Sequence, residues 1–407
     1  MSDYEFLTRE NIPEYLKSRA ETHLIIDHNN LVDINEVGDG NLNLVFIIKD
    51  KSGKGIVLKQ ALPYVRLVGP SWPMSPDRAR IEFETTKAHA AAAPDLVPVI
   101  YFYDPKRYII AMEDLSDHRV WRGALNDGEF HYGSAKAVGE YIARALFATS
   151  IFGLGQSKHK LEVARAINPE MSLITEDLVF TEPWYPSGRN SYLPENEVDA
   201  QSLISDEFMK TEIAKLKYDF MTNSEALIHG DLHSGSVMVK ADPSGNSLST
   251  KAFDSEFSFF GPIAFDIGAV IANFYIAMAR AVALDRAEHL KYLAKLPFET
   301  WESFESNFRN LWSGRAEKEV FGDEFLEILL NKWRFDSIGF ATAKMSRRIV
   351  GLAKTTDIES LEPTIRIGAA RGVLQSAQML IRERVNNSDI THLTQEVISI
   401  LKNVRTN

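Results

Sequence analysis

The segment 228–236 (IHGDLHSGS) holds the densest group of chemically useful side chains in the sequence. Gly230 and Gly235 can place the backbone in conformations closed to other residues, and so project the carboxylate of Asp231 at a fixed angle. A carboxylate held in this way can accept the proton of an attacking hydroxyl group. The alternatives are a capping aspartate and buried, hydrogen-bonded histidines. They explain a dense His-Gly-Asp cluster between apolar runs less well.

Two further carboxylates, Asp254 and Glu256, follow downstream in a segment rich in phenylalanine. Alternate residues of an extended segment point the same way, so both carboxylates can face one site. Hard oxygen ligands in an apolar setting suit Mg²⁺ that also binds the phosphates of a nucleotide. The alternative is a solvated strand face. Burying unpaired carboxylates among phenylalanines is costly, which favours metal binding.

A turn that contains Gly38 and Gly40 is expected between two strands, in the segment 38–43 (GDGNLN). Its glycines allow backbone N–H groups to approach phosphate oxygens. Taken alone, the pattern favours an ordinary hairpin, since Asn and Gly dominate hairpin turns. Asn43 stands where a G-x-G-x-x-G loop has its third glycine. No Walker A sequence occurs in the chain, so a P-loop enzyme is not expected.

Lys59 lies on the strand expected after this turn, over 55–60 (GIVLKQ). Alternation places its side chain on the same face as Val57. A lysine among apolar residues is most often an edge-strand solubiliser. The functional interpretation is a charge that contacts the α- and β-phosphates of a nucleotide. Such a lysine needs a carboxylate to hold it, and Glu82 and Glu84 on the following helix are available.

The elements that must position these residues change character along the chain. Strand patterns and turn signals dominate the first part, and helical patterns dominate the rest, apart from the loop and flanking strands around Asp231 and Asp254. The helix after Lys59 begins near Asp77, which can cap it. Strands are expected at 32–37, 44–49, 55–60, 96–103 and 107–113, and a later helix at 137–152.

This order predicts an α+β fold with two lobes. We expect a small β-rich N-terminal lobe over 1–112, a hinge over 113–117, and a larger, mainly helical C-terminal lobe over 118–407.

Composition narrows the function classes. The formal net charge of −11 repels a phosphate backbone, so nucleic acid is not an expected partner. The chain has no cysteine, which excludes disulfides, cysteine nucleophiles and thiolate metal sites. The N-terminus lacks the apolar core of a secretory signal. The apolar stretch 268–284 is interrupted by Asn273 and Arg280, so it is expected to be a buried helix rather than a membrane span. We therefore expect a cytoplasmic protein with no membrane partner.

Taken together, the glycine-containing hairpin, the lysine on the third strand, the His-Gly-Asp segment and the downstream carboxylates resemble the aminoglycoside phosphotransferase and choline kinase group, which has a protein-kinase-like fold. The chain more closely resembles the 5-methylthioribose kinase family. The matching segments are GDGNLNLVF at 38–46, LKQALPYVRLVGPSWPM at 58–74, RARIE at 78–82, MEDLS at 112–116, HGDLHSGS at 229–236, DSEFSFFGPIAFDIG at 254–268 and RRIVGLA at 347–353.

The resemblance implies roles for individual residues. Asp231 would be the catalytic base, or at least orient the substrate hydroxyl, while Asp254 and Glu256 would bind Mg²⁺. The ATP-binding residues would be Gly38, Gly40, Asn41, Asn43 and Lys59, with Glu113, Asp114 and Leu115 in the hinge that holds adenine. The substrate-binding residues would be Asp231, Arg347, Arg348 and Trp72.

Ser236 stands where many kinases carry a metal-binding asparagine, and a second carboxylate from Glu256 can compensate for the poorer serine ligand. Adjacent arginines on a helix usually face solvent.

Met345, Ile349 and Leu352 mark an apolar stripe, so one of Arg347 and Arg348 is expected to border it. With the resemblance, the pair becomes a candidate for stabilising charge on a transferring phosphoryl group.

The resemblance implies phosphorylation of the 1-hydroxyl of 5-methylthioribose by ATP with Mg²⁺, a step of methionine salvage, by a homodimer. Three alternatives stay open. The acceptor could be an aminoglycoside, choline or homoserine. The chain could be a catalytically inactive nucleotide-binding scaffold, although Lys59, Asp231 and Asp254 are all present. A kinase acting on proteins is the least favoured, because no long activation loop lies between Asp254 and Asp266.

Overall fold

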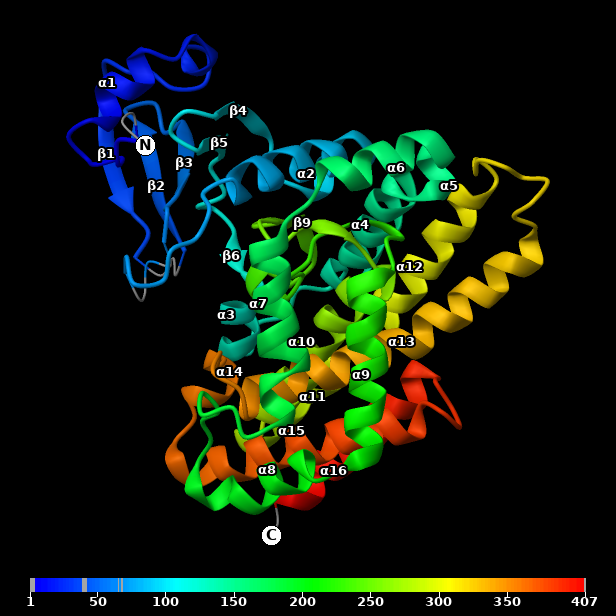
Figure 1. The fold of residues 1–407 in the computed structure, drawn as a ribbon. Coiled ribbons are helices and arrows are strands. Elements are labelled where there is room, and N and C mark those ends of the chain that lie inside the picture. Colours follow the sequence, from blue (N-terminus) through cyan, green and yellow to red (C-terminus); the bar gives the residue numbers. More distant parts are fainter. Residues whose placement is uncertain (1–3, 39–41, 65, 67–68, 406–407) are drawn as a thin grey trace.

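A five-stranded antiparallel sheet forms the N-terminal part of the protein (Figure 1). The computed structural model describes residues 4–38, 42–64, 66 and 69–405. The strands occur in the order β1-β2-β3-β5-β4, and each expected strand is present. Their bounds are β1 Leu31–Glu36, β2 Asn43–Asp50, β3 Gly55–Ala61, β4 Ile100–Asp104 and β5 Ile109–Glu113.

The alternation on β3 divides the sheet into two packed faces. Ile56 and Leu58 pack into one cluster with residues of helix α1, Ile12–Lys17. Val57 packs on the other face with residues of helix α2, Arg78–Ala92. β3 lies between β2 and β5, so the interpretation of Lys59 as an edge-strand solubiliser is wrong.

Asp77 precedes α2 as predicted, but its side chain does not cap the helix. Its carboxylate instead accepts hydrogen bonds from Arg80, with Oδ2 at 2.7 Å from Nη2. An ion pair with Arg80 thus replaces the capping interaction that the sequence suggested.

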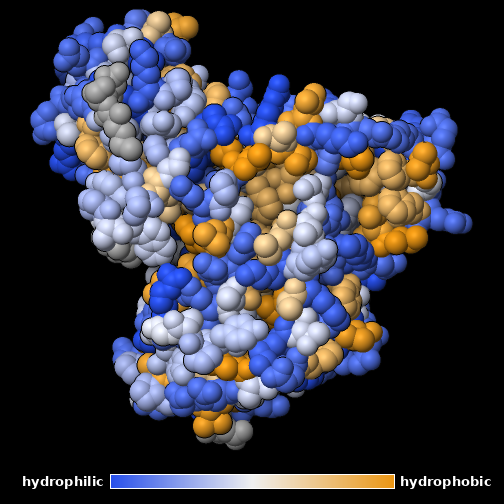
Figure 2. All heavy atoms as spheres, viewed as in Figure 1, coloured by the Kyte–Doolittle hydropathy of each residue, from blue (hydrophilic) through white to orange (hydrophobic). Residues whose placement is uncertain are grey.

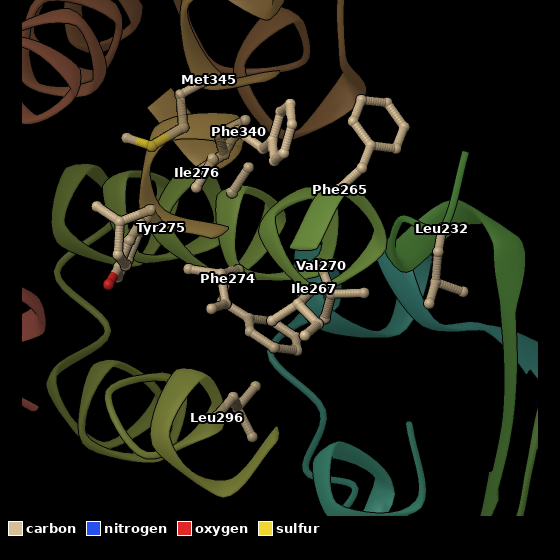
Figure 3. Close-up of a cluster of buried hydrophobic side chains, with 14 of the residues drawn as sticks. Leu232, Phe265, Ile267, Val270, Phe274, Tyr275, Ile276, Leu296, Phe340 and Met345 are labelled. Atoms are coloured by element: carbon tan, nitrogen blue, oxygen red, sulfur yellow. The ribbon is translucent and has the colours of Figure 1, made fainter. Parts of the chain in front are cut away.

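The larger part of the chain is built around one buried helix, α10 (Ile263–Ala283). By length and composition α10 could cross a bilayer, but 94% of its apolar 18-residue stretch is buried inside the protein. This burial agrees with the predicted core helix. α10 packs along α13 (Asp323–Ile349). In Figure 3, Phe265 and Phe340 lie at this contact, with ring centroids 5.4 Å apart.

The remaining helices surround this centre (Figure 1). The α-helices are α3 Trp121–Asp127, α4 Ser134–Thr149, α5 Ile151–Leu154, α6 Gln156–Arg165, α7 Pro169–Phe180, α8 Glu197–Ile204, α9 Glu207–Thr222, α11 Ala287–Leu293, α12 Leu296–Trp312, α14 Thr356–Glu359, α15 Pro363–Glu383 and α16 Ile390–Arg405. Short 3₁₀ helices are η1 Ala20–Thr22, η2 Pro94–Leu96, η3 Glu182–Trp184, η4 Pro194–Asn196 and η5 Ser234–Ser236.

Two small sheets hold the loops that carry Asp231 and Asp254. β7 (Ala226–Ile228) pairs with β10 (Phe259–Gly261), and β8 (Val237–Ala241) pairs with β9 (Ser247–Ala252) and β6 (Arg119–Val120). The segment 229–236 therefore runs from β7 to β8, and 253–258 runs from β9 to β10. The flanking strands were predicted from the sequence, and their pairings bring the two loops side by side.

Hydrophilic and apolar residues occupy different regions of the surface seen in Figure 2. Figure 2 shows hydrophilic residues over most of the sheet-bearing part and the C-terminal helices, with apolar residues gathered in the middle of this face. The five-stranded sheet ends at Glu113, and the later strands belong to the two small sheets. The lobe boundaries at 112 and 117 stay a prediction.

Candidate active site

Lys59 lies at the centre of a buried charge cluster. Its Nζ lies 2.7 Å from Oε2 of Glu82 and also forms an ion pair with Oδ1 of Asp254. Glu82, rather than Glu84, is thus the carboxylate of α2 that holds the lysine. Burial alone would lower the pKa of Lys59, but Asp254, Glu82 and Glu256 raise that pKa above its ordinary value. Burial raises the pKa of Glu82 to about 7 despite the neighbouring ammonium group.

Glu256, in the same cluster, has two further side-chain partners. Its carboxylate accepts hydrogen bonds from Asn43 Nδ2, at 3.0 and 3.2 Å, and from Arg78 Nε at 3.0 Å. The Arg78 guanidinium also donates to Asn43 Oδ1. The Asn43 side chain, predicted to contact ATP, is therefore committed to Glu256 and Arg78 here, and its contact with ATP stays a prediction.

Three carboxylates come together at this place. Ligand oxygens of Glu82, Asp254 and Glu256 all lie within 4.8 Å of one another. They share two cationic partners, Lys59 and Arg78, so the cluster carries an excess of negative charge when all three are ionised. Carboxylate oxygens at this separation match the donor set that a divalent cation requires.

Asp254 is the accessible member of this cluster. Its side chain is 40% exposed, whereas that of Glu256 is 5% exposed. Its backbone φ is +69°, a left-handed conformation that is uncommon outside glycine. Such a conformation persists only where the surrounding structure imposes it, and it is most frequent at functional sites.

The loop that carries Asp231 is fixed by glycine geometry. Gly230 has φ +82°, and a Cβ there would lie 2.2 Å from the carbonyl oxygen of Phe257. The sequence interpretation of Gly230 is therefore confirmed. Gly235 differs, because its φ is not positive; a Cβ there would instead lie 2.8 Å from Nη1 of Arg122. Close approach of a side chain, not backbone conformation, explains that glycine.

Asp266, in the first turn of α10, anchors the same loop. Its two carboxylate oxygens accept from the backbone N–H groups of His229, at 2.7 Å, and Gly230, at 3.1 Å. The neighbouring Leu232 is fully buried in the core. Burial raises the pKa of Asp266, although the two N–H groups act in the opposite direction. Sequence analysis did not assign this residue, although an acidic side chain at the start of a highly apolar helix is a usable signal.

Asp231 faces cations rather than other carboxylates. Its Oδ1 accepts a hydrogen bond from Lys344 Nζ at 2.9 Å, and its Oδ2 lies 3.3 Å from His233 Nε2. Burial would raise the pKa of Asp231, but Lys344, His233 and Arg347 hold that pKa well below its ordinary value. The carboxylate is therefore ionised at neutral pH and can accept a hydrogen bond from a hydroxyl group.

The arginine pair lies at the end of α13, and neither member is fully exposed. Arg347 is 8% exposed, and its Nε has no hydrogen-bond partner among the described residues. Burial lowers the pKa of Arg347, while Asp231 acts in the opposite direction. Arg348 Nη1 donates to the carbonyl oxygens of Ala353 and Lys354. The two arginines therefore have different surroundings, and the general expectation that both face solvent is wrong.

The stripe predicted around these arginines is correct only in part. Met345 and Ile349 are buried, but Leu352 is 44% exposed. α13 ends at Ile349, so the helical spacing no longer applies three residues later.

The expected hinge connects the large sheet to the small sheet of β9. The Glu113 carboxylate accepts from the backbone N–H of Val99, at 3.0 Å, and from Lys251 Nζ, at 2.9 Å. Asp114 accepts from the backbone N–H of Ser116 at 2.9 Å, and Leu115 is buried. The side chains of Glu113 and Asp114 are therefore engaged in hydrogen bonds within the protein that stabilise the expected hinge.

The other predicted residues have varied surroundings. Gly38 is described and has open space around it, whereas Gly40 and Asn41 lie outside the described residues. Trp72 packs with Leu42, Met74, Met171, Ile174 and Phe257, close to the Asp254 loop. Ser236 Oγ donates to the backbone oxygen of Asp231 at 3.1 Å and is buried, so here it supports the loop.

Lys344 and Arg78 contact the predicted site residues but were not identified from sequence. Lys344 precedes Arg347 by three residues on a helix, a spacing that places both on one face. Arg78 lies in the RARIE segment that carries the family resemblance. Both signals were available, but neither specifies the partner.

No family model matches the chain. Among solved structures, a glucosamine kinase in complex with glucosamine, ADP and inorganic phosphate matches with a TM-score of 0.52 and 13% identity, covering 93% of this chain and 86% of that one. This likeness shows the fold. With the sheet, the helical part and the lysine–carboxylate site described above, it defines a protein with a protein-kinase-like fold.

Curated relatives extend over nearly the whole chain. Methylthioribose kinase from Cronobacter sakazakii is 42% identical over 372 residues, covering 88% of this chain and 91% of that protein. Methylthioribose kinase from Pectobacterium atrosepticum is 36% identical over 408 residues, covering 98% and 99%. The chain belongs to the methylthioribose kinase family.

Proposed function

We propose that this protein transfers the γ-phosphoryl group of ATP to the 1-hydroxyl of 5-methylthioribose, giving 5-methylthioribose 1-phosphate and ADP in methionine salvage. Family membership supports the substrate. The observation that carries the reaction is the ionised Asp231, set among Lys344, His233 and Arg347 on the loop next to the one that carries Asp254. Phosphoryl transfer needs such positioning and charge stabilisation more than covalent chemistry.

In the proposed reaction, Asp231 orients the 1-hydroxyl and accepts its proton. The hydroxyl oxygen forms a bond to the γ-phosphorus, and the bond from that phosphorus to the β,γ-bridging oxygen breaks, its electron pair leaving with ADP. Arg347, whose Nε lacks a partner among the described residues, is suited to the charge on the transferred group. Trp72 is proposed to border the acceptor.

The nucleotide is proposed to lie against the large sheet. Lys59 would contact its phosphates, as would the turn that includes Gly38, Gly40, Asn41 and Asn43. The segment Glu113–Leu115 would hold the adenine between an N-terminal lobe, 1–112, and a C-terminal lobe, 118–407. The side chains of Glu113 and Asp114 are occupied within the protein, so the backbone of this segment is proposed to bind the adenine. The Glu113 N–H already donates to the Val99 carbonyl, and the Leu115 carbonyl accepts from the His118 N–H, so other backbone groups of the segment would be used.

Asp254 and Glu256 are the residues proposed to hold Mg²⁺, with Glu82 beside them. The close approach of the three carboxylates and the accessibility of Asp254 fit this ion. When bound, Mg²⁺ neutralises charge on the nucleotide phosphates. Lys59 separately holds the Asp254 carboxylate by their ion pair.

The remaining partners are also proposals. We propose a cytoplasmic homodimer that binds no nucleic acid and no membrane. The net charge of −11 supports the absence of a nucleic-acid partner, and the burial of α10 within the protein supports the absence of a membrane partner. The homodimer is proposed from the family resemblance.

The testing experiment is ADP release with Mg-ATP against 5-methylthioribose, ribose, choline, homoserine and kanamycin. Turnover with 5-methylthioribose alone is the expected result. Turnover only with another acceptor would retain the kinase chemistry and overturn the substrate. ATP binding without turnover on any acceptor would favour a nucleotide-binding scaffold instead.

A further inference from the structure

Lys344 is a lysine of α13 whose side chain is only 6% exposed, and its ammonium group bonds to the carboxylate of Asp231. The two residues are 113 positions apart in the sequence. The Asp231 side chain is 22% exposed, so the carboxylate lies toward the solvent side and the ammonium toward the protein interior. An acceptor entering from solvent therefore meets Asp231 first, with Lys344 behind it.

The surroundings of Lys344 fix the ammonium group in place. Its Nζ lies 4.6 Å from the centroid of the Phe265 ring, which is fully buried in the core. A buried ammonium group without a counter-charge is strongly unfavourable. The ion pair therefore favours the side-chain conformation of Asp231 in which Oδ1 faces Lys344. That conformation places Oδ2 beside His233 Nε2, at 3.3 Å, and an acceptor hydroxyl can use the second lone pair of this oxygen.

We propose that Lys344 is a positioning residue for phosphoryl transfer, which holds the Asp231 carboxylate in its reactive orientation and keeps it charged. This inference rests on the proposed kinase function. It adds a residue on which the orientation of the attacking hydroxyl depends. An ion pair that served stability alone would not need a carboxylate whose side chain stays 22% exposed to solvent.

The groups that face this pair come from three elements. His233 faces Asp231 from its own loop, and Arg347 faces it from α13. Arg347 and Arg348 both face Lys344, and Asp266 of α10 also interacts with it. Burial lowers the pKa of Lys344 to about 8, although Asp231 acts in the opposite direction. The ammonium group is therefore charged below about pH 8 and loses its proton above it, and the hydrogen-bonded cation of Asp231 is lost with it.

The test compares Lys344→Met and Lys344→Arg with the wild-type enzyme. Lys344→Met is expected to lower kcat about 100-fold, with the KM for ATP changed less than about threefold, since the nucleotide does not contact Lys344 in the proposed arrangement. Lys344→Arg is expected to recover at least about tenfold of this loss and to shift the alkaline fall of kcat upward, because a guanidinium stays charged. A wild-type kcat in folded Lys344→Met would overturn the proposal.

A matched control lies on the same helix. Lys332 also pairs with carboxylates, those of Asp336, Asp219 and Glu225 at 2.8, 3.6 and 3.8 Å, but it contacts no residue of the site in the described structure. Lys332→Met is expected to keep the wild-type kcat. An equal loss of kcat in Lys332→Met and Lys344→Met would assign the effect to helix stability and overturn the positioning role.

Two further measurements separate this inference from the substrate assignment. In the Asp231→Asn background, Lys344→Met is expected to lower kcat less than twofold further, because both changes disable one unit. A crystal structure of Lys344→Met is expected to show the Asp231 carboxylate rotated from its wild-type orientation, whatever the acceptor. An unmoved carboxylate would overturn the inference, whereas an inactive wild-type enzyme in the acceptor panel would overturn only the proposed function.

Discussion

Charges of opposite sign are separated between the two halves of the site. On one side, Glu82, Asp254 and Glu256 surround Lys59. On the other, Lys344 and Arg347 flank Asp231. The first group suits a cation shared with a nucleotide, and the second suits a transferred anionic group. The two groups of residues are therefore suited to different parts of the reacting complex.

At the residue scale, Asp231→Asn is the sharpest test of the reaction. The amide keeps the size of the side chain but cannot accept the proton, so kcat is expected to fall at least about 100-fold. ATP affinity is expected to stay within about threefold, because Lys59 and the hinge segment lie elsewhere. Steady-state ADP release and calorimetric ATP binding measure the two effects. Activity within tenfold of wild type would remove Asp231 from its proposed role.

Single residues also mark the limit of sequence reasoning. Lys59 and Asp231 could be singled out because their motifs are local. Lys344 and Arg78 could not be paired with Asp231 and Glu256, because these contacts join residues that are far apart in the chain. Burial and ion pairing across such distances depend on packing, which no short motif records.

At the element scale, the turn from β7 into the Asp231 loop depends on one glycine. Gly230→Ala would require a left-handed conformation and place Cβ 2.2 Å from a backbone oxygen. We expect the free energy of unfolding to fall by roughly 1 to 3 kcal/mol, with a loss of activity in the folded fraction. Gly322→Ala is the control, since its φ is −71° and its surroundings are open. Equal stability of the two variants in urea unfolding would contradict this account.

His89 links three elements and makes their association sensitive to pH. Its ring lies 2.8 Å from both the Tyr141 hydroxyl of α4 and the Leu227 carbonyl of β7. Burial lowers the pKa of His89 from 6.5 to about 4. Between pH 4 and 6.5 the His89 side chain is protonated in the unfolded chain but neutral in the folded protein. The contribution of His89 to the free energy of unfolding is therefore fully present above pH 6.5 and is lost as the pH falls toward 4.

The expected contribution of His89 is a slope of about 1.4 kcal/mol per pH unit across that window. His89→Gln removes the titration, so its free energy of unfolding should decline less steeply between pH 6.5 and 4.5. Urea unfolding at several pH values measures both slopes. Parallel curves for the two proteins would exclude His89 as a source of the pH dependence.

Elements were predicted more completely than their ends. The five strands of the large sheet and the helix after Lys59 follow from alternation and turn signals. The burial of Leu352 was predicted wrongly because the chain leaves α13 at Ile349. Gly351, directly after the C-cap residue Val350, was the available signal for this end. The missing Asp77 cap arose because a nearby arginine competes for the same carboxylate.

At the scale of the whole molecule, buried polar contacts join the large sheet and α2 to the helical part. Glu256 bonds to Arg78 of α2 and Asn43 of β2, and Lys59 of β3 pairs with Asp254. Side-chain exposures of 1% for Arg78 and 5% for Glu256 mean that neither charge is relieved by water.

Glu256→Ala is therefore expected to lower the free energy of unfolding by about 3 to 5 kcal/mol, because it leaves the Arg78 guanidinium buried and unpaired. Glu84→Ala is the control: it breaks the ion pair between Glu84 and Arg80, in which the Glu84 side chain is 49% exposed. It is expected to lower the free energy of unfolding by less than about 1 kcal/mol. Chemical unfolding without added metal measures both. A Glu256→Ala protein as stable as Glu84→Ala would show that Arg78 finds another partner.

The hydrogen bonds from the loop of Asp231 to Asp266 make the position of the Asp231 carboxylate depend on the packing of the core. Asp266 belongs to the first turn of α10, the helix at the centre of the core, so the position of the reacting carboxylate is referenced to the interior and not to the surface. Lys344, on α13, bonds to the Asp231 carboxylate itself, and α13 packs against α10. Substitutions that change the volume of buried side chains in α10 and α13 should therefore displace the Asp231 carboxylate. They should lower kcat at a smaller change in packing than is needed to unfold the protein.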